Sequence, residues 1–183
     1  ALAGRAIKVA GSKNLCLAGG VALNCVANGA LLRSGMFEKI WVQPAAGDSG
    51  AALGAALIAA YQSDKNLKRR VDGTTDSMRG SYLGPKFNRD YITKDLSACE
   101  AVFEELDEES LLDKVVDYLV SGSAIGWFQG RMEFGPRALG NRSIIADPRS
   151  YAMQTDLNLK IKFRESFRPF APSVLAEEAS SWF

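Results

Sequence analysis

The strongest constraint on the fold is a repeated order of strand, glycine turn and helix within the first 62 residues. The run NLCLAGG (14–20) is apolar and ends in paired glycines, and apolar residues at helical spacing follow it up to Gly35. The run KIWVQP (39–44) predicts a second strand, and GDSGAALGAALIAAYQ (47–62) predicts a glycine turn and an alanine-rich helix. Strands and helices that alternate over such short distances favour an α/β layer with a mostly parallel sheet.

A second α/β part is expected after a polar connection, SDKNLKRRVDGTTDSMRG (63–80). We therefore expect two domains, residues 1–80 and residues 81–183. The elements expected in the second are a helix within 104–122 capped by Ser110 and ended by Gly122, a buried strand within 123–130, a strand within 143–148, and a helix within 150–162 capped by Ser150.

The composition limits the possible partners. The chain is 47% hydrophobic and 23% charged, as expected of a globular protein with a core, and its net charge of +1 gives no overall attraction to nucleic acid or membrane. No apolar run approaches the roughly 20 residues that span a bilayer. The basic cluster Lys68, Arg69 and Arg70 is followed by acids, which favours a solvated surface over nucleic-acid binding.

The cysteines and the missing histidines limit the chemistry. Cys16, Cys25 and Cys99 fit no metal spacing, so we expect small apolar fillers rather than reactive thiols, in a reducing, cytoplasmic setting. The chain has no histidine, which excludes Ser-His-Asp and Cys-His catalysis and a His-rich metal site built from this chain alone. It has no initiator Met and its patterns are cut at both ends, so we expect a piece of a longer protein.

Two glycine-flanked helix starts are candidate ligand contacts. Gly19 and Gly20 let a ligand approach the backbone where a helix begins, and Asn24, one turn into that helix, could bind a ribose or phosphate. Asp48 stands between Gly47 and Gly50, where it could face a phosphate or a metal ion. The structural alternatives are a tight strand-to-helix turn and an N-cap at Asp48. Because both turns follow successive strands, we expect one ligand cleft.

The stretch GRMEFGPRALGNRSI (130–144) holds three arginines, and Glu133 is its only acid. Residues 129–168 contain eight basic side chains against four acidic ones. A buried guanidinium needs a carboxylate or an anionic ligand. Salt bridges to the acidic residues of 104–117 are one explanation. The glycines and the proline of the loop favour the other, a small, doubly anionic ligand bound by arginine forks and backbone donors.

Four blocks together resemble the O-carbamoyltransferase family typified by nodulation protein U and the antibiotic carbamoyltransferases. They occur in the family's order over nearly the whole chain: LAGGVALNCVANGALL (17–32), VQPAAGDSGAALGAAL (42–57), GRMEFGPRALGNRSIIADPR (130–149) and KFRESFRPFAPSVL (162–175). The resemblance implies an α/β chain in which the later portion of an actin-like ATPase domain, like that of the tRNA threonylcarbamoyl-transferase, precedes part of a threonylcarbamoyl-AMP synthase-like domain.

The resemblance also implies a reaction and assigns residues to it. Carbamoyl phosphate and ATP would give a carbamoyl-adenylate in the synthase-like part, and the carbamoyl group would pass to a hydroxyl of a small-molecule acceptor in the ATPase-like part. The residues that match catalytic positions are Arg137, Arg142, Lys162 and Arg164. Those that match nucleotide-binding positions are Gly19, Gly20, Val21, Asn24, Asn141 and Ser143.

Asp48 matches a metal-ligating aspartate of the family, whose other ligands include histidines that this chain lacks. We expect a divalent ion of the iron or magnesium type in the full-length protein but poor binding by this chain. No protein nucleophile is needed for adenylation, because fixed positive charge can stabilise the approach of two anions.

Three alternatives follow from the same residues. The chain could be a non-catalytic nucleotide- or anion-binding module, or part of a carbamoyl-adenylate enzyme of tRNA modification or hydrogenase maturation. The hydrogenase type carries cysteine clusters, and this chain has none. We expect the parent protein to be an enzyme, for which a homodimer is one candidate assembly. We expect this chain by itself to have little or no transfer activity.

Overall fold

The computed structural model describes residues 2–68 and 72–182. Arg69 and Arg70 of the predicted basic cluster lie outside the described residues. The chain forms two compact units, the first made of Ala1–Asp95 with Phe128–Arg142 and the second of Leu96–Trp127 with Ser143–Phe183. A loop from late in the sequence thus belongs to the first unit. The domain boundary expected near residue 80 stays a prediction.

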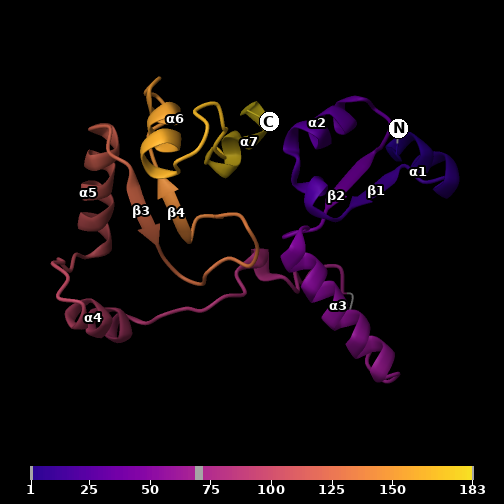
Figure 1. Ribbon diagram of the computed structural model, residues 1–183, viewed down its shortest axis with the longest axis horizontal. Coiled ribbons are helices and arrows are strands. Elements are labelled where there is room, and N and C mark those ends of the chain that lie inside the picture. The colour runs from indigo at the N-terminus through magenta and orange to yellow at the C-terminus, as the bar shows by residue number, and fades with distance from the viewer. Residues whose placement is uncertain (1, 69–71, 183) are drawn as a thin grey trace. The chain divides into compact units, whose positions relative to one another are not determined.

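Helix and strand alternate from α1 to α3, as predicted for an α/β layer, and farther along the chain consecutive helices precede a pair of strands (Figure 1). Those of the first half are α1 (Leu2–Ala10), β1 (Asn14–Leu17), the 3₁₀ turn η1 (Gly20–Leu23), α2 (Cys25–Arg33), β2 (Lys39–Val42), α3 (Asp48–Ser63), the 3₁₀ turn η2 (Arg79–Ser81) and α4 (Arg89–Ala98). Those of the second half are α5 (Glu108–Val120), β3 (Ile125–Phe128), β4 (Arg142–Ile145), α6 (Met153–Asp156), the π turn η3 (Leu157–Ile161), the 3₁₀ turn η4 (Ala176–Glu178) and α7 (Ala179–Trp182). The structure is mixed α/β, while the two family-level domain folds stay predictions.

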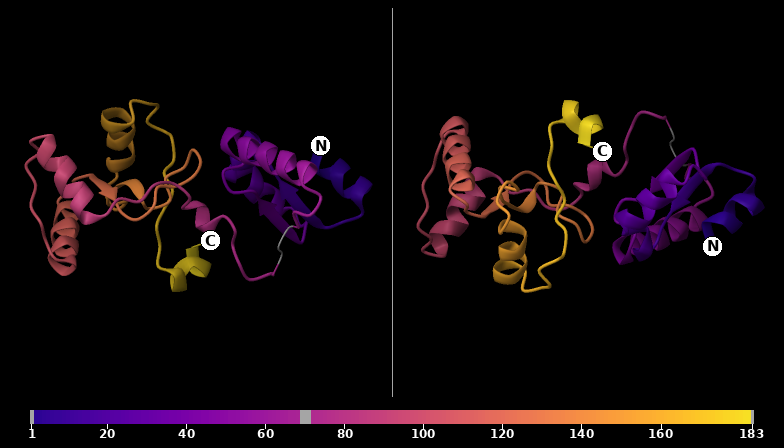
Figure 2. Two further views of the ribbon diagram at one scale, coloured as in Figure 1. Left: turned by 90° about the horizontal axis from the view of Figure 1, so that it is seen from below. Right: turned by 90° about the horizontal axis from the view of Figure 1, so that it is seen from above.

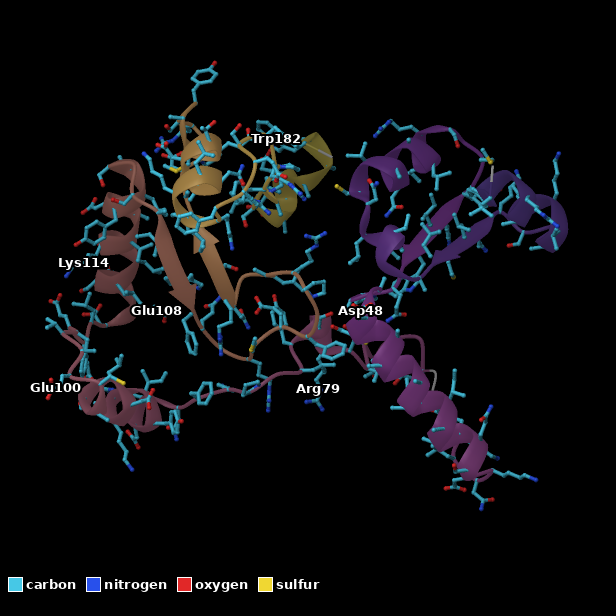
Figure 3. The ribbon with its side chains drawn as sticks, viewed as in Figure 1. Asp48, Arg79, Glu100, Glu108, Lys114 and Trp182 are labelled. Atoms are coloured by element: carbon cyan, nitrogen blue, oxygen red, sulfur yellow. The ribbon has the colours of Figure 1, made fainter. Side chains whose placement is uncertain are left out.

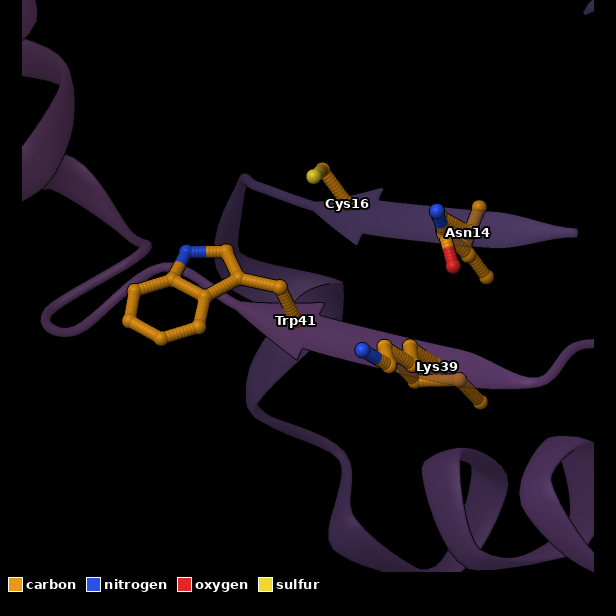
Figure 4. Close-up of a pocket in the computed structure, with 6 residues that line it drawn as sticks. Asn14, Cys16, Lys39 and Trp41 are labelled. Carbon is orange, nitrogen blue, oxygen red and sulfur yellow. The ribbon is translucent and has the colours of Figure 1, made fainter. Parts of the chain in front are cut away.

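The strands β1 and β2 form a parallel pair, which confirms the first prediction. Asn14 lies opposite Lys39, and Leu17 lies opposite Val42. Exposure alternates along both strands, so one face of the pair is half-buried and the other is exposed. The exposed face carries Asn14, Cys16, Lys39 and Trp41 (Figure 4).

The helices of the first unit begin at positions that differ slightly from the prediction. Asn24 is not inside a helix but is the N-cap of α2, and Gly35 ends that helix with a φ of 67°. Asp48 is not an N-cap, because Gly47 holds that position and Asp48 is the first residue of α3. A carboxylate in the first turn still interacts favourably with the helix dipole. After η2, residues 82–88 run without helix or strand to α4 (Figure 2).

The strands β3 and β4 form a two-stranded sheet and run in opposite directions (Figure 1). The expectation of a buried strand at β3 was wrong, because its residues alternate between half-buried and exposed. The expected cap of α5 was also wrong. Asp107 is the N-cap, and its carboxylate accepts hydrogen bonds from the backbone N–H of Ser110 at 2.9 Å and from its hydroxyl at 3.0 Å. Gly122, with a φ of 88°, follows the C-cap of α5 as expected.

The helix predicted from Ser150 begins later and is irregular. Ala152 is the N-cap of α6, and the carbonyl of Ser150 accepts the backbone N–H of Met153 at 3.1 Å. A single α-helical turn is followed by the π turn η3, and the apolar side chains of Met153 and Leu157 are buried. Ser150 therefore contributes to a turn that precedes the helix.

Few side chains are buried in the described residues. The buried apolar ones are Ala22, Phe37, Ala46, Met153 and Leu157. The three cysteines are free thiols on exposed residues, so the prediction of buried fillers was wrong. None of the described helices has the length and apolar character required to cross a bilayer.

Candidate functional site

The two glycine turns lie together at the carboxyl ends of β1 and β2. The backbone N–H of Gly19 donates to the carbonyl of Ala46 at 2.7 Å. A Cβ placed on Gly47 would lie 3.9 Å from the Cα of Gly20, in ordinary van der Waals contact. The carboxyl ends of parallel strands are where α/β proteins bind ligands. The sequence-based expectation that the two turns adjoin is therefore met by the geometry.

The predicted nucleotide contacts differ in what they can still offer a ligand. The N–H of Gly19 is engaged by Ala46, and only a residue that tolerates its φ of 92° fits there. Val21 is 84% exposed in η1. The Oδ1 atom of Asn24 accepts the backbone N–H of Ala27 at 3.0 Å, which gives this side chain a structural role as a helix cap.

Asp48 is exposed at the first turn of α3 (Figure 3). Its carboxylate forms no hydrogen bond or ion pair with another residue of 2–68 or 72–182, so it is open to a ligand. Within that described part of the chain, no three His, Cys, Asp or Glu side chains are grouped to hold a metal ion. A divalent ion at Asp48 would need further ligands.

The arginine-rich loop packs against the turn that leads to Asp48. Gly135 has a φ of 112°, and a Cβ placed on it would lie 2.6 Å from the Cβ of Ala45. Any larger residue at position 135 would displace one of the two segments. Ala45 itself has a positive φ of 53°. The first unit thus brings together two stretches that the sequence predicted as sites.

The loop is held in place by a segment that no sequence pattern had indicated. Residues 81–85 exchange backbone hydrogen bonds with it: Gly84 N–H to Met132 O at 2.9 Å, Met132 N–H to Pro85 O at 3.0 Å and Phe134 N–H to Ser81 O at 2.6 Å. The hydroxyl of Tyr82 donates to the carbonyl of Leu139 at 2.6 Å. Arg131 joins this scaffold, since its Nη1 donates to the carbonyl of Gly84 at 3.0 Å.

Glu133 anchors the loop from inside. Its side chain is buried, and Oε1 accepts the backbone N–H groups of Leu139 at 2.8 Å, Asn141 at 2.8 Å and Arg142 at 3.1 Å. Burial opposes ionisation, but these hydrogen bonds outweigh it and lower the pKa of Glu133 to about 2. The sole acid of the stretch therefore binds backbone N–H groups.

The loop's arginines divide by their contacts. The Arg142 Nη1 donates to the carbonyls of Gln129 at 2.6 Å and Asn141 at 2.7 Å, and the guanidinium lies 3.5 Å from the centre of the Phe128 ring. Arg137 is exposed, and its guanidinium contacts no carboxylate or carbonyl of the described residues. Arg137 is thus available to an anion, whereas Arg142 already stabilises the loop.

Asn141 and Ser143 flank the last arginine of the loop. The Nδ2 of Asn141 donates to the carbonyl of Arg131 at 2.7 Å, so this side chain also holds the loop closed. Ser143 is half-buried in β4. Their predicted contacts with a nucleotide stay predictions.

The Lys-x-Arg pair of the second unit lies in a loop built around Asn158. This wholly buried side chain donates to the carbonyls of Ser166 at 3.0 Å and Arg168 at 2.9 Å, and it accepts Nε of Arg164 at 2.6 Å. The Arg164 guanidinium lies 4.9 Å from the centre of the Phe170 ring. Lys162 is exposed, and its ammonium has no ion pair with any residue of the described ranges.

The ion pairs of the basic stretch are local. Arg149 pairs with Asp147, Lys160 with Asp156 at 3.0 Å, and Arg168 with Glu165 at 3.1 Å. On the acidic side, Lys114 pairs with Glu104. The alternative in which acidic residues of 104–117 neutralise the loop arginines finds no support among these pairs.

The sequence matches models of the carbamoyltransferase N-terminus, over residues 5–57, and of the carbamoyltransferase C-terminus, over residues 116–183. The uncharacterized protein sll1178 of Synechocystis sp. is 59% identical over 175 residues, which are 94% of this chain and 28% of the relative. Nodulation protein NolO of Bradyrhizobium diazoefficiens is 45% identical over 177 residues, 96% of this chain and 31% of the relative. Nodulation protein U of Sinorhizobium fredii is 38% identical over 175 residues, 94% of this chain and 28% of the relative.

The chain spans less than a third of the length of these relatives. The N-terminal and C-terminal models of the family match this chain in that order. The chain belongs to the carbamoyltransferase family.

Proposed function

We propose that this chain is part of an O-carbamoyltransferase that uses carbamoyl phosphate and ATP and transfers the carbamoyl group to a hydroxyl of a small-molecule acceptor. Family membership supports the transferase class. The observation that carries the proposal further is Arg137, an exposed guanidinium with no partner among the described residues, on a loop in which Glu133, Asn141 and Arg142 are hydrogen-bonded within the loop.

The chemistry asks for fixed positive charge. Carbamoyl phosphate, ATP and a carbamoyl-adenylate all carry phosphate groups, and their reaction brings like charges together. A guanidinium on a preorganised loop stabilises that charge without reorganising during the reaction. In the first unit the candidate for this charge is Arg137, and in the second unit, taken by itself, the candidate is Lys162.

Arg142 and Arg164 have a different role in this proposal. Each guanidinium is held by hydrogen bonds and lies over an aromatic ring, so each one fixes the loop that carries the free cation.

The turns at the strand ends are the proposed nucleotide-binding region. Gly20 and Val21 open η1 beside the start of α3, where backbone N–H groups suit an anion. Asp48 would contribute one carboxylate to a divalent ion of the iron or magnesium type. Since no further ligands are grouped with it in the described residues, we expect weak metal binding by this chain.

The test is calorimetric titration of the chain with carbamoyl phosphate, inorganic phosphate and ATP, repeated on Arg137→Ala and Lys162→Ala. We expect saturable binding of carbamoyl phosphate that Arg137→Ala weakens about tenfold or more, since it removes a charge-assisted contact. Titration of Lys162→Ala tests separately whether the second unit binds phosphate. Lys13→Ala is the matched control, because Lys13 is an exposed lysine that pairs with the exposed Glu38. Folded protein that binds none of the three compounds would contradict the proposal.

Transfer activity is a separate expectation. We expect the chain alone to carry little or no carbamoyl transfer to an acceptor, because it spans less than a third of its relatives' length. Measurable transfer by the purified chain would refute that expectation. Binding of phosphate with no preference for the carbamoyl ester would favour a general anion-binding module instead.

A further inference from the structure

The carboxylate of Glu133 binds backbone N–H groups, although the residue lies in a stretch with three arginines. The residue is 7% exposed, and its carboxylate accepts hydrogen bonds from the backbone N–H groups of Leu139, Asn141 and Arg142. A buried carboxylate loses hydration and must recover it from donors of good geometry. Three donors at 2.8 to 3.1 Å meet that requirement.

These hydrogen bonds close a loop around Arg137. The donors Leu139, Asn141 and Arg142 lie six, eight and nine residues beyond Glu133, so Arg137 stands inside the closed segment. Gly135 and Gly140 have φ values of 112° and 104°, which side chains rarely adopt. The loop conformation is therefore specified both by its glycines and by the carboxylate at its centre.

The same bonds decide which donors remain for a ligand. The N–H groups of residues 139, 141 and 142 would form a natural anion-binding set, and the Glu133 carboxylate already occupies it. The guanidinium of Arg142 and the side-chain amide of Asn141 donate hydrogen bonds to loop carbonyls. An external anion at this loop therefore has Arg137 as its free cation.

We infer that Glu133 is a positioning residue: it holds the loop so that Arg137 is presented to the phosphate of the substrate, and it keeps the loop's own N–H groups from binding that phosphate. This inference rests on the proposed function. It adds to that proposal two separate roles: the Glu133 carboxylate accepts the backbone N–H groups of the loop, and Arg137 binds the ligand.

The experiment is a double-mutant cycle on carbamoyl phosphate affinity with Glu133→Gln, Arg137→Ala and the double variant. Glutamine keeps the shape and one acceptor oxygen but loses the charge. We expect Glu133→Gln to weaken binding about fivefold, Arg137→Ala to weaken it about tenfold or more, and the double variant to bind no more weakly than Arg137→Ala alone. Glu38→Gln is the control, because Glu38 is an exposed acid paired with Lys13 in the same unit.

A spectroscopic readout separates positioning from general stability. The amide proton resonances of Leu139, Asn141 and Arg142 should move upfield and exchange faster in Glu133→Gln, while those of residues 14–17 stay unchanged. Should Glu133→Gln be too unstable to titrate, Glu133→Asp is the second variant, since it keeps the charge and shortens the reach. It should weaken binding less than removing Arg137 does.

Each outcome decides a different statement. Wild-type affinity in Glu133→Gln, or unchanged amide resonances at 139, 141 and 142, would overturn the inference and leave the proposed function standing. Additive losses in the double variant would also overturn it, because Glu133 would then act independently of Arg137. If the wild-type chain binds no carbamoyl phosphate, the proposed function fails and the inference fails with it.

Discussion

Two loops carry the predicted anion-binding residues, and each is built around one buried polar side chain of a different kind. The loop of the first unit closes on Glu133, a carboxylate that accepts three backbone N–H groups. The loop of the second unit closes on Asn158, an amide that donates to two carbonyls and accepts Nε of Arg164. A charged side chain and a neutral one thus each hold a loop closed. Only the charged one should lose this effect when the pH falls.

The difference follows from the groups to be satisfied. Inside the first loop, backbone donors point inward and call for an acceptor. Inside the second, backbone carbonyls point inward and call for a donor. Each loop has one exposed cation whose charged group forms no hydrogen bond or ion pair with a described residue, Arg137 in the first and Lys162 in the second. Ligand-binding charge is therefore separated from the charge and polarity that hold the loop.

The largest effect is expected from Asn158→Ala. It removes the wholly buried amide that donates to the carbonyls of Ser166 and Arg168 and accepts Nε of Arg164, which should cost about 3 kcal/mol of unfolding free energy. Urea unfolding measures it. Gln154→Ala is the matched control, because Gln154 is an exposed amide that donates to the same Arg168 carbonyl at 3.1 Å. Equal losses in the two variants would contradict the role of Asn158 as the anchor.

A second prediction separates the anchors by pH. Folding lowers the pKa of Glu133 to about 2 from an ordinary value of 4.5, so the ionised carboxylate stabilises the fold. That stabilisation is fully present above pH 4.5 and is lost as the pH falls toward 2, with a total of about 3 kcal/mol. The quantity to measure is the difference in unfolding free energy between the wild type and Glu133→Gln at pH 6 and at pH 2.5.

The difference should be large at pH 6 and small at pH 2.5. Other acids, such as Asp107 and Asp147, also have lowered pKa values, but they contribute equally to both proteins and cancel in the difference. Asn158→Ala should show a loss that does not depend on pH over this range. A wild-type advantage over Glu133→Gln that is constant with pH would show that the charge of Glu133 is not what holds the loop.

The smallest of the three effects compares the two arginines of one loop. Arg142→Ala removes hydrogen bonds to three carbonyls and the contact with the Phe128 ring, so we expect about 1 to 2 kcal/mol of destabilisation. Arg137→Ala removes no such contact and should change stability by less than about 0.5 kcal/mol. Thermal unfolding of both variants checks this. The reverse order would show that Arg137 is the structural arginine.

Local patterns in the sequence were enough to find the strands and most helix ends. The parallel pairing of β1 and β2 and the stops at Gly35 and Gly122 follow from apolar spacing and from the backbone freedom of glycine. The caps were harder to predict. Asp107 and Ser110 are three residues apart and both suit an N-cap, so the choice depends on where the helix can begin in the fold.

The arrangement of the site was only partly predictable. The sequence indicates Arg137 and Arg142 equally as candidates. Their roles differ because Arg142 donates to the carbonyl of Gln129 and lies over the Phe128 ring. Glu133 was noticed only as a possible neutraliser, since its donors become neighbours only once the loop is closed. Residues 81–85 have neither periodicity nor charge clustering, so nothing in their sequence shows that they support the loop.

We expect Arg137, and not Arg142, to be the arginine that binds the anionic ligand of the first loop. The most direct measurement is an NMR titration of the chain with carbamoyl phosphate, in which the side-chain Nε–H resonances of the two arginines are assigned by substitution. We predict that the Arg137 resonance shifts to saturation while the Arg142 resonance stays in place. A saturable shift at Arg142 with none at Arg137 would show that Arg142 is the binding arginine and that this assignment of roles is wrong.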